Sequence, residues 1–331
     1  MKASPPGMPG LSDWLTNLSQ FLARLGVIAV VLGTLATLPA RWYWFSDLLA
    51  NLRIQQLIAG AIVVLFCLFI KQFRLALIGA LCFSVHLVPM MPELVPTSAS
   101  GATADAPLRL MTINVLTRNH AYQRVADEIR QVDPDLVAIL ELSSGLNAYL
   151  SRELADAYPH RLSSPEDSGN FGIGVFSKLA FDEARMFQLN ENITSIEVVC
   201  GGNQVVATHP LPPMGSDGFQ SRNQHLSLLA ARISQQRHEF PERPIVVLGD
   251  FNVTPWSPHF RRFQRASGLH RAKLGIAVTP TWYARGSDFP FGLVLDHIFI
   301  NDSLRCVEYR VGDDIGSDHR SVSVALRRTR F

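Results

Sequence analysis

The stretch VVLGDFNVTPWSP, residues 246–258, contains the pattern that decides the fold. Residues 245–248 are apolar and mostly β-branched, which predicts a short strand buried on both faces. Gly249 permits close backbone approach, and Asp250 and Asn252 follow where this strand should end. Residues two apart on a strand point the same way, so we expect these two side chains to project together. A buried carboxylate needs a partner or a cation, although Asp, Asn and Pro are also typical of an ordinary turn.

The downstream sequence alternates between strand and helix patterns. Strands are predicted at residues 108–115, 136–140, 172–176, 196–199, 204–208, 245–248, 295–300 and 321–326, and helices at 122–131 and 222–236. Because hairpins are mixed with helical crossovers, this pattern predicts an α/β fold with two sheets packed together and helices outside.

Polar residues stand at the ends of many of these apolar runs. They are Asn114, Glu141, His209, Asp250, Asn252, Asp296, Asp318 and His319. One such residue indicates a turn, whereas this many together indicate a site. A group rich in carboxylate oxygen and without cysteine suits Mg²⁺ or Mn²⁺, which complete their coordination with water and substrate phosphate.

The first ninety residues hold most of the excess of apolar residues. The chain of 331 residues is 47% hydrophobic, and its mean hydropathy of +0.14 is high for a soluble enzyme. Apolar stretches at 25–40, 54–70 and 75–91 are each near the minimum length for crossing a bilayer. Residues 1–91 are therefore predicted to be an α-helical membrane domain of three spans. Buried helices of a soluble bundle are the alternative; a cleavable signal peptide would have one such stretch.

Basic residues set the expected orientation in the membrane. The predicted cytoplasmic side has Lys2, Arg24, Lys71 and Arg74, and the other side has Arg41 and Arg53. This distribution favours a cytoplasmic N-terminus and places the downstream region outside the cytoplasm. Residues 42–45, WYWF, fit an interfacial aromatic belt or packing between helices. Residues 92–107 are rich in Pro, Ser, Thr, Ala and Gly and are predicted to be a linker.

The downstream region is close to electrically neutral, which argues against a large basic footprint for nucleic acid. A cluster of basic residues is interpreted as a solvated helix face; its members are Arg261, Arg262, Arg265, Arg271 and Lys273. Cys200 and Cys306 could pair in an oxidising compartment, although isolated thiols are more often simply buried.

Short motifs along the downstream region carry a family resemblance. They are TINVL (112–116), PDLVAILE (134–141), GVFSK (174–178), THP (208–210), GDFN (249–252), LDHIF (295–299) and GSDHR (316–320). In this order they resemble the endonuclease/exonuclease/phosphatase superfamily, which includes pancreatic deoxyribonuclease, abasic-site endonucleases and neutral sphingomyelinases. GDFN with a downstream SDH is the specific part of the signal. PWS (255–257) and RNQ (222–224) resemble the membrane-anchored bacterial members.

The resemblance implies a four-layered α/β sandwich over residues 108–331, with two mixed sheets flanked by helices. It also implies a metal-dependent phosphoester hydrolase, first of all a nuclease-like phosphodiesterase. The apolar stretches and their basic flanks, not the resemblance, give the expected location: the bacterial inner membrane, with the catalytic domain in the periplasm. The alternative is a phospholipid or sphingomyelin-type phosphodiesterase or phosphatase at the membrane surface, for which residues 289–293 could form an apolar lip. An inactive interaction module is the third reading, and the sequence gives no indication of a protein partner.

The resemblance and the residue types together assign roles. The expected metal ligands for Mg²⁺ or Mn²⁺ are Glu141, Asn114 and Asp318; the expected catalytic residues are Asp250, His319, Asp296 and His209; Asn252 and His209 are expected to contact the phosphate. Either Asp250 or His319 could be the general base. His225, His259 and His297 are interpreted as structural. Leu116 stands where abasic-site endonucleases have an acid, which puts DNA repair in doubt.

Overall fold

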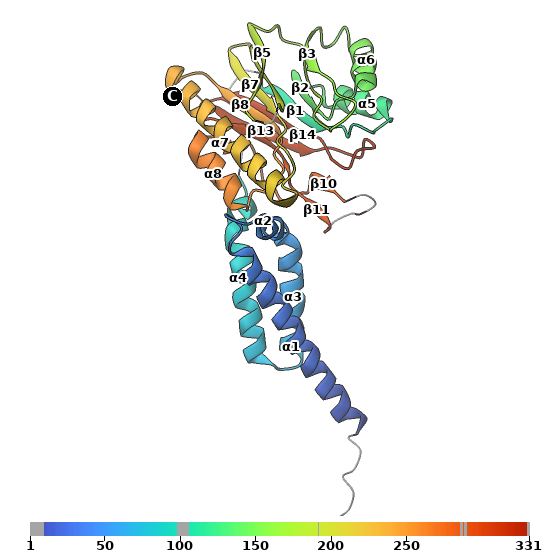
Figure 1. Cartoon of the computed structure of the whole chain (residues 1–331), viewed down its shortest axis with the longest axis vertical. Coiled ribbons are helices and arrows are strands. Elements are labelled where there is room, and N and C mark those ends of the chain that lie inside the picture. The colour runs from blue at the N-terminus through green and yellow to red at the C-terminus, as the bar shows by residue number, and fades with distance from the viewer. Residues whose placement is uncertain (1–9, 98–105, 191, 285–286, 288–289, 330–331) are drawn as a thin grey trace, which may run out of the picture. The chain divides into compact units, whose positions relative to one another are not determined.

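The computed structural model describes residues 10–97, 106–190, 192–284, 287 and 290–329. The chain divides into two compact units, residues 1–91 and residues 92–331 (Figure 1).

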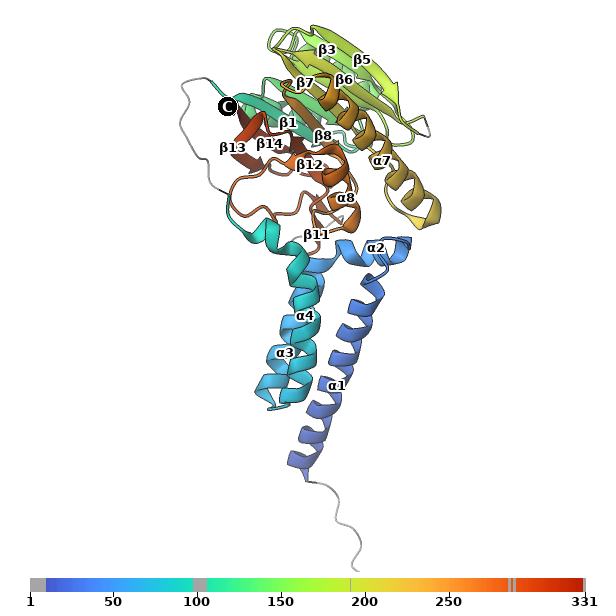
Figure 2. The same ribbon diagram turned by 90° about the vertical axis from the view of Figure 1, so that its left-hand side faces the viewer.

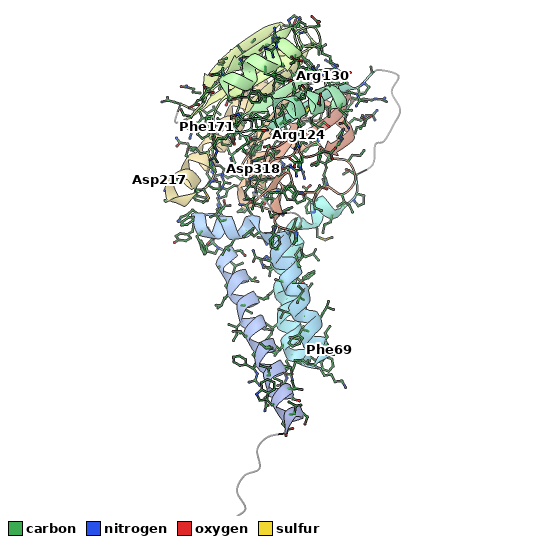
Figure 3. All side chains as sticks on the ribbon, turned by 90° about the vertical axis from the view of Figure 1, so that its right-hand side faces the viewer. Phe69, Arg124, Arg130, Phe171, Asp217 and Asp318 are labelled. Carbon is green, nitrogen blue, oxygen red and sulfur yellow. The ribbon has the colours of Figure 1, made fainter. Side chains whose placement is uncertain are left out.

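The first unit is a bundle of helices. They are α1 (Leu11–Thr37), α2 (Trp44–Asn51), α3 (Arg53–Phe69) and α4 (Phe73–Leu94), of which α4 continues into the second unit. By length and composition α1 and α4 could each cross a membrane, and α2 with α3 would add a third span if this pair, bent by 67°, counts as one. Apolar side chains such as Phe69 project outward from the bundle (Figure 3). The structure thus has two or three candidate spans where the sequence predicts three.

The second unit contains two six-stranded sheets. The order of the first is β13 (Leu304–Val311), β14 (Val322–Arg328), β1 (Leu108–Asn114), β2 (Leu136–Leu140), β4 (Ile173–Ser177), β3 (His160–Ser164). The order of the second is β5 (Glu183–Gln188), β6 (Thr194–Cys200), β7 (Asn203–Thr208), β8 (Ile245–Asp250), β12 (Asp296–Ile300), β9 (His270–Arg271). A small hairpin pairs β10 (Trp282–Tyr283) with β11 (Gly292–Leu293).

Helices cover the outer face of each sheet. In Figure 1, α7 (Gly215–Glu239) and α8 (Pro258–Ser267) lie to the left of the sheets, and α5 (Tyr122–Val132) and α6 (Ser144–Glu153) lie to the right. Figure 2, in which the left-hand side of Figure 1 faces the viewer, shows α7 and α8 in front of the strands that they cover. Along β1, Leu110 packs into the core between the sheets, while its neighbour Met111 packs beneath α5 and α6. This alternation, repeated in both sheets, confirms the four-layered α/β sandwich.

The strand directions bring several strand ends to one edge. Each sheet contains one parallel pair, β1–β2 in the first sheet and β7–β8 in the second. Strands β12 and β14 run antiparallel to β8 and β1, so that Asp296 starts β12 directly opposite Asp250 at the end of β8. The carboxyl ends of both parallel pairs and the starts of β12 and β14 therefore lie together.

Several elements were not predicted from the sequence: β3, β5, α6, α8 and β13. Residues 255–258, taken as a turn, lead into α8, where the Ser257 hydroxyl caps the helix by accepting from the His259 amide at 3.2 Å. Helix α7 begins at Gly215 rather than at residue 222. Cys200 and Cys306 are free thiols.

The interpretation of the basic cluster as one solvated helix face is wrong for Arg271. This residue lies in β9, and its buried guanidinium donates to the Glu93 carboxylate at 2.8 Å. Thr97 pairs with Gly275 in the next loop. The first residues of the expected linker, 92–97, therefore belong to the second unit and contact its strand β9 and the loop after it; residues 98–105 lie outside the described residues.

Candidate functional site

Three chain segments that leave strands at the common edge pass through the left-handed backbone region. Leu116 follows β1 with φ 60°, Glu141 follows β2 with φ 57°, and Asn252 follows β8 with φ 50°. Such a backbone costs about 1–3 kcal/mol for a residue other than glycine and tends to gather at functional sites. Alternation along β2 would direct Glu141 toward the helices, together with Ile139. Instead the chain turns, and the Glu141 carboxylate reaches Asn114.

Asp250 is the central residue of the edge. Its Oδ2 lies 3.3 Å from Asn114 Nδ2, 3.4 Å from His209 Nε2 and 3.6 Å from His319 Nε2. Its Oδ1 accepts from the backbone amide of Asn252 at 2.9 Å. Because Asp250 follows Val246 and Leu248 on the inner face of β8, its carboxylate lies between the two sheets.

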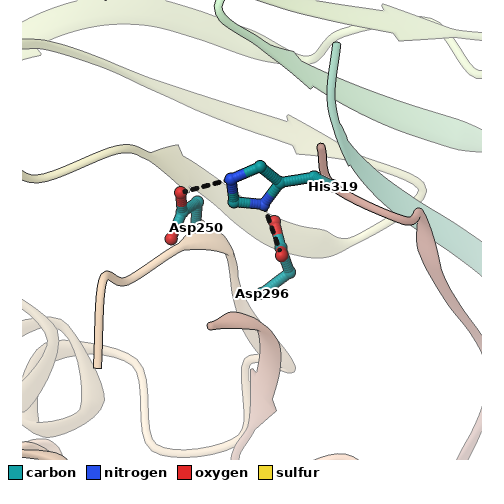
Figure 4. A group of neighbouring side chains, drawn as sticks. All are labelled: Asp250, Asp296 and His319. Atoms are coloured by element: carbon teal, nitrogen blue, oxygen red, sulfur yellow. Dashed lines mark hydrogen bonds and ion pairs between the residues drawn. The ribbon is translucent and has the colours of Figure 1, made fainter. Parts of the chain in front are cut away.

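His319 lies between two carboxylates (Figure 4). Its Nδ1 is 2.9 Å from Asp296 Oδ2, and its Nε2 faces Asp250. Burial opposes a charged imidazole, but the carboxylates of Asp296 and Asp250 outweigh burial and raise the pKa of His319 to about 10. Burial would raise the pKa of Asp250, but His319 and His209 outweigh burial and lower it. The geometry therefore supports an imidazolium facing an ionised carboxylate at neutral pH.

Asn114 links Asp250 to Glu141. Its Nδ2 donates to Glu141 Oε1 at 3.0 Å as well as to Asp250, while its Oδ1 accepts from the Leu116 amide at 3.1 Å. The other carboxylate oxygen of Glu141 accepts from the Thr117 amide at 3.2 Å. Two carboxylates thus lie on either side of one amide group, and each Glu141 oxygen accepts one hydrogen bond here, which leaves it a lone pair for a cation.

His209 follows β7 and lies beside Asp250. Its ring is buried, packs against Phe171 with centroids 5.7 Å apart, and has an Nδ1 without a hydrogen-bond partner. Burial would lower the pKa of His209, but Asp250 and then Glu141 outweigh burial and raise it. The unpartnered Nδ1 is a buried polar atom that a substrate oxygen could satisfy.

Asn252 is placed differently from the expectation, and Asp318 has an indole partner. Strand β8 ends at Asp250, so Asn252 is not on the strand; its Nδ2 donates to the Pro210 carbonyl at 3.0 Å. Asp318, labelled in Figure 3, is half-buried, and its Oδ2 accepts from the Trp282 indole at 3.1 Å. The structure brings together Asn114, Glu141, His209, Asp250, Asp296 and His319; Asn252 and Asp318 border this group.

Two of the three histidines interpreted as structural, His225 and His297, have hydrogen-bond partners outside the group around Asp250. His225 Nε2 lies 2.7 Å from the Thr208 hydroxyl, and its Nδ1 lies 2.9 Å from Asn190 Oδ1. Burial lowers the pKa of His225 to about 3, so its ring is neutral. His297 Nε2 donates to the Val253 carbonyl at 2.8 Å. These contacts are the ones a structural histidine makes, and the structural interpretation of both residues stays a prediction.

Sequence reasoning missed three residues beside the site: Thr117, Phe171 and Thr281. Thr117 acts through its backbone amide, which no sequence pattern reveals. Phe171 precedes the GVFSK strand and looks like an ordinary core residue. Thr281 precedes the short strand β10, and its hydroxyl accepts from the amides of Leu295 and Asp296 at 3.0 Å each.

Among the described residues, two groups of side chains at this edge could hold a metal ion. Asp250, Asp296 and His319 offer ligand atoms that all lie within 4.8 Å of one another. In that group both imidazole nitrogens already face carboxylates. The carboxylate oxygens of Glu141 and Asp250, bridged by the Asn114 amide nitrogen, suit a hard cation such as Mg²⁺ better, because Mg²⁺ prefers oxygen ligands.

Comparison with known proteins agrees with this architecture. The model of the Endonuclease/Exonuclease/phosphatase family matches residues 111–319. No curated protein matches the sequence.

Solved structures with the same fold are distant in sequence. An endonuclease/exonuclease/phosphatase from Beutenbergia cavernae is 20% identical, with a TM-score of 0.54 over 68% of this chain and 72% of that chain. The 3′ phosphatase NExo from Neisseria, bound to a product DNA hairpin, is 19% identical. Its TM-score is 0.55, and the match covers 66% of this chain and 98% of that chain. D. rerio TDP2 complexed with single-strand DNA product is 16% identical. Its TM-score is 0.54, and the match covers 67% of this chain and 100% of that chain.

Proposed function

The chain belongs to the endonuclease/exonuclease/phosphatase family, and from this premise we propose that it is a divalent-metal-dependent phosphodiester hydrolase. The observation that carries the proposal is the position of Asp250. This carboxylate contacts the Asn114–Glu141 pair on one side and the His319–Asp296 pair on the other. An acid, a base and an oxygen-rich cation site within reach of one point are what phosphoester hydrolysis requires.

Asp250 is proposed as the general base. A phosphodiester is negatively charged and repels hydroxide, so the attacking water must be oriented and deprotonated where it is needed. Asp250 is ionised and lies at the centre of the group, whereas His319 retains its proton at neutral pH. His319 is therefore proposed to donate to a phosphoryl oxygen, with Asp296 fixing the orientation of its ring.

The remaining residues complete the site. Glu141, Asn114 and Asp250 would hold Mg²⁺ or Mn²⁺, and such an ion supplies charge neutralisation at the phosphoryl and leaving oxygens when it is bound. His209 has a buried free Nδ1 and is proposed to contact the phosphate or protonate the leaving group. Asn252 has a second amide hydrogen beyond the one given to Pro210, and we propose it for the phosphate without adding charge.

A nucleic acid is the first candidate substrate. Proteins with the same fold were solved with a DNA product, and this supports a nucleic-acid phosphodiester here. Leu116 still argues against abasic-site repair. A phospholipid-type phosphoester is the second candidate, favoured by the exposed ring of Phe291 beside β11; the neighbouring Phe289 lies outside the described residues.

The domain organisation follows from the apolar helices. We propose that residues 1–91 anchor the chain in the bacterial inner membrane, that residues 92–107 connect the two units, and that residues 108–331 form the catalytic domain outside the cytoplasm. Two or three candidate spans support the anchor.

Hydrolysis by the full-length protein in detergent tests the function. The substrates are bis-p-nitrophenyl phosphate, single- and double-stranded DNA, and phospholipid vesicles, each with Mg²⁺ or Mn²⁺. Turnover that both EDTA and Asp250→Ala abolish would support the proposal, and the preferred substrate would separate the two candidates. No turnover of any of these by folded protein, or turnover unaffected by Asp250→Ala, would contradict it.

A further inference from the structure

Thr281 and the strand that follows it, β10, form hydrogen bonds to both chain segments that supply the Asp296–His319 pair. On one side, the Thr281 hydroxyl oxygen accepts from the backbone amides of Leu295 and Asp296, at 3.0 Å each. On the other side, Trp282 forms an antiparallel bridge with His319. The two residues of the pair lie far apart in the sequence, and β10 connects them through short contacts.

The bonds to the His319 segment extend over three residues. The Tyr283 amide donates to the Asp318 carbonyl at 2.8 Å, and the Arg320 amide donates to the Thr281 carbonyl at 2.6 Å. The Trp282 indole adds a side-chain bond to Asp318 Oδ2 at 3.1 Å. Backbone hydrogen bonds at Asp318 and Arg320, the residues before and after His319, thus fix the position of His319.

The Thr281 hydroxyl acts on Asp296 in two ways: it accepts from the Leu295 and Asp296 amides, and its hydrogen bond to the Asp296 carboxyl opposes the rise that burial causes in the pKa of that carboxyl. The side chain is fully buried, and its oxygen receives two main-chain donors at the point where β12 begins. Asp296 is also fully buried, and its Oδ1 has no hydrogen-bond partner. The direction of its carboxylate toward His319 therefore depends strongly on its backbone, which Thr281 fixes.

We propose that Thr281 and Trp282 are positioning residues that hold the Asp296–His319 pair in line with Asp250, and that the Asp318 carboxylate serves the Trp282 indole rather than a metal ion. This inference rests on the proposed hydrolase function for its kinetic consequence. Displacing a catalytic group by about 1 Å costs on the order of 10²-fold in rate, so a small shift of the pair is measurable.

Paired variants of the full-length protein test the role of Thr281. Thr281→Val keeps the shape and removes the acceptor, and we expect kcat to fall roughly 10- to 100-fold with KM almost unchanged. Thr281→Ser keeps the oxygen and should restore kcat to within a few-fold of wild type. Circular dichroism and thermal melts of both variants report whether the fold is retained. Equal kcat for the Val variant and wild type, or equal losses for Val and Ser, would overturn the proposal.

A spectroscopic measurement separates this inference from the proposed function. The Nδ1 proton of His319, hydrogen-bonded to Asp296, should give a downfield proton resonance that is absent in His319→Gln. Thr281→Val and Trp282→Phe should shift or broaden it, and Thr281→Ser should retain it. If the wild-type protein hydrolyses nothing, the function fails and this resonance still decides the positioning role. An unchanged resonance in Thr281→Val would sink that role.

The assignment of Asp318 is tested by metal binding alone. Asp318→Asn keeps an oxygen that can accept from Trp282, and we expect it to bind Mn²⁺ with the wild-type dissociation constant in a calorimetric titration. A dissociation constant weakened about 10-fold or more, as loss of a charged ligand predicts, would make Asp318 a metal ligand and overturn this part of the proposal.

Discussion

The Asp250 carboxylate faces the His319 imidazole, with Oδ2 and Nε2 3.6 Å apart. Asp250 ends a strand of one sheet, and His319 precedes β14, a strand of the other. Their contact therefore depends on how the two sheets pack. Each group favours the charged form of the other, so the pKa of Asp250 is lowered and the pKa of His319 is raised. The proton therefore stays on the imidazole.

Asp250→Asn should abolish most of the activity. The amide has a similar shape but cannot accept a proton from water, so we expect kcat to fall by about 10²- to 10⁴-fold, the usual contribution of a general base. Asp302→Asn is a matched control, because the Asp302 side chain is 76% exposed and lies away from the site residues. A kcat for Asp250→Asn within about threefold of this control would exclude Asp250 as the base.

The pH dependence of kcat shows whether His319 acts as a proton donor or as a base. If protonated His319 donates to the phosphoryl oxygen, activity persists from neutrality up to pH about 10 and falls above it, as the imidazole loses its proton. Asp296→Asn removes the carboxylate that contributes most to raising the pKa of His319, so the alkaline fall should move to lower pH. Activity that instead rises as the pH approaches 10 would identify His319 as the base.

The sequence predicted the composition of the site because strand ends are visible as apolar runs followed by a polar residue. Asn114, Glu141 and Asp250 fit that pattern, whereas Asp296 begins its strand, and the fold brings all four together. The pattern says nothing about how a chain turns after its strand. Asn252 is in a left-handed turn rather than on the strand, which changes its direction.

Contacts formed by backbone groups or over long range could not be predicted. Thr281 acts through its hydroxyl, which accepts from two amides, and through its backbone, and its sequence neighbourhood resembles any loop. Arg271 stands in a run of basic residues, yet pairing with Glu93 buries it. Helix α2 begins at Trp44 within a stretch whose aromatic composition indicates an interface more clearly than a helix.

Acid should destabilise the protein through His225. Its pKa is about 3 in the fold and near 6.5 when exposed, so below pH about 6.5 the unfolded chain binds a proton that the folded chain rejects. The free energy of unfolding should fall as the pH decreases from about 6.5 to about 3, by up to about 1.4 kcal/mol per pH unit. His225→Gln cannot take up that proton, so denaturant titrations should show a shallower acid dependence for it than for wild type. Equal pH slopes for the two proteins would contradict the buried neutral imidazole.

If residues 1–91 form the proposed membrane anchor, the number of spans decides on which side of the membrane the second unit lies. Three spans place the two chain ends on opposite sides, whereas two spans place them on the same side. We expect an epitope tag after Phe331 to be cleaved by protease added to intact spheroplasts, and a tag before Met1 to be protected until lysis. Protection of both tags would indicate two spans and a cytoplasmic catalytic domain.

Removal of the metal should abolish activity, and Glu141→Gln should raise the metal concentration that activity requires. Because Glu141 and Asp250 flank Asn114, losing one carboxylate weakens a cation there without removing the base, so kcat should recover substantially at high Mn²⁺. We expect the Mn²⁺ dissociation constant, measured by calorimetry, to rise about 10- to 100-fold. Glu308→Gln is the control, since that carboxylate is exposed and pairs with Arg109. If Glu141→Gln binds Mn²⁺ as wild type does while His319→Gln binds it weakly, the ion belongs to the Asp250, Asp296 and His319 group instead.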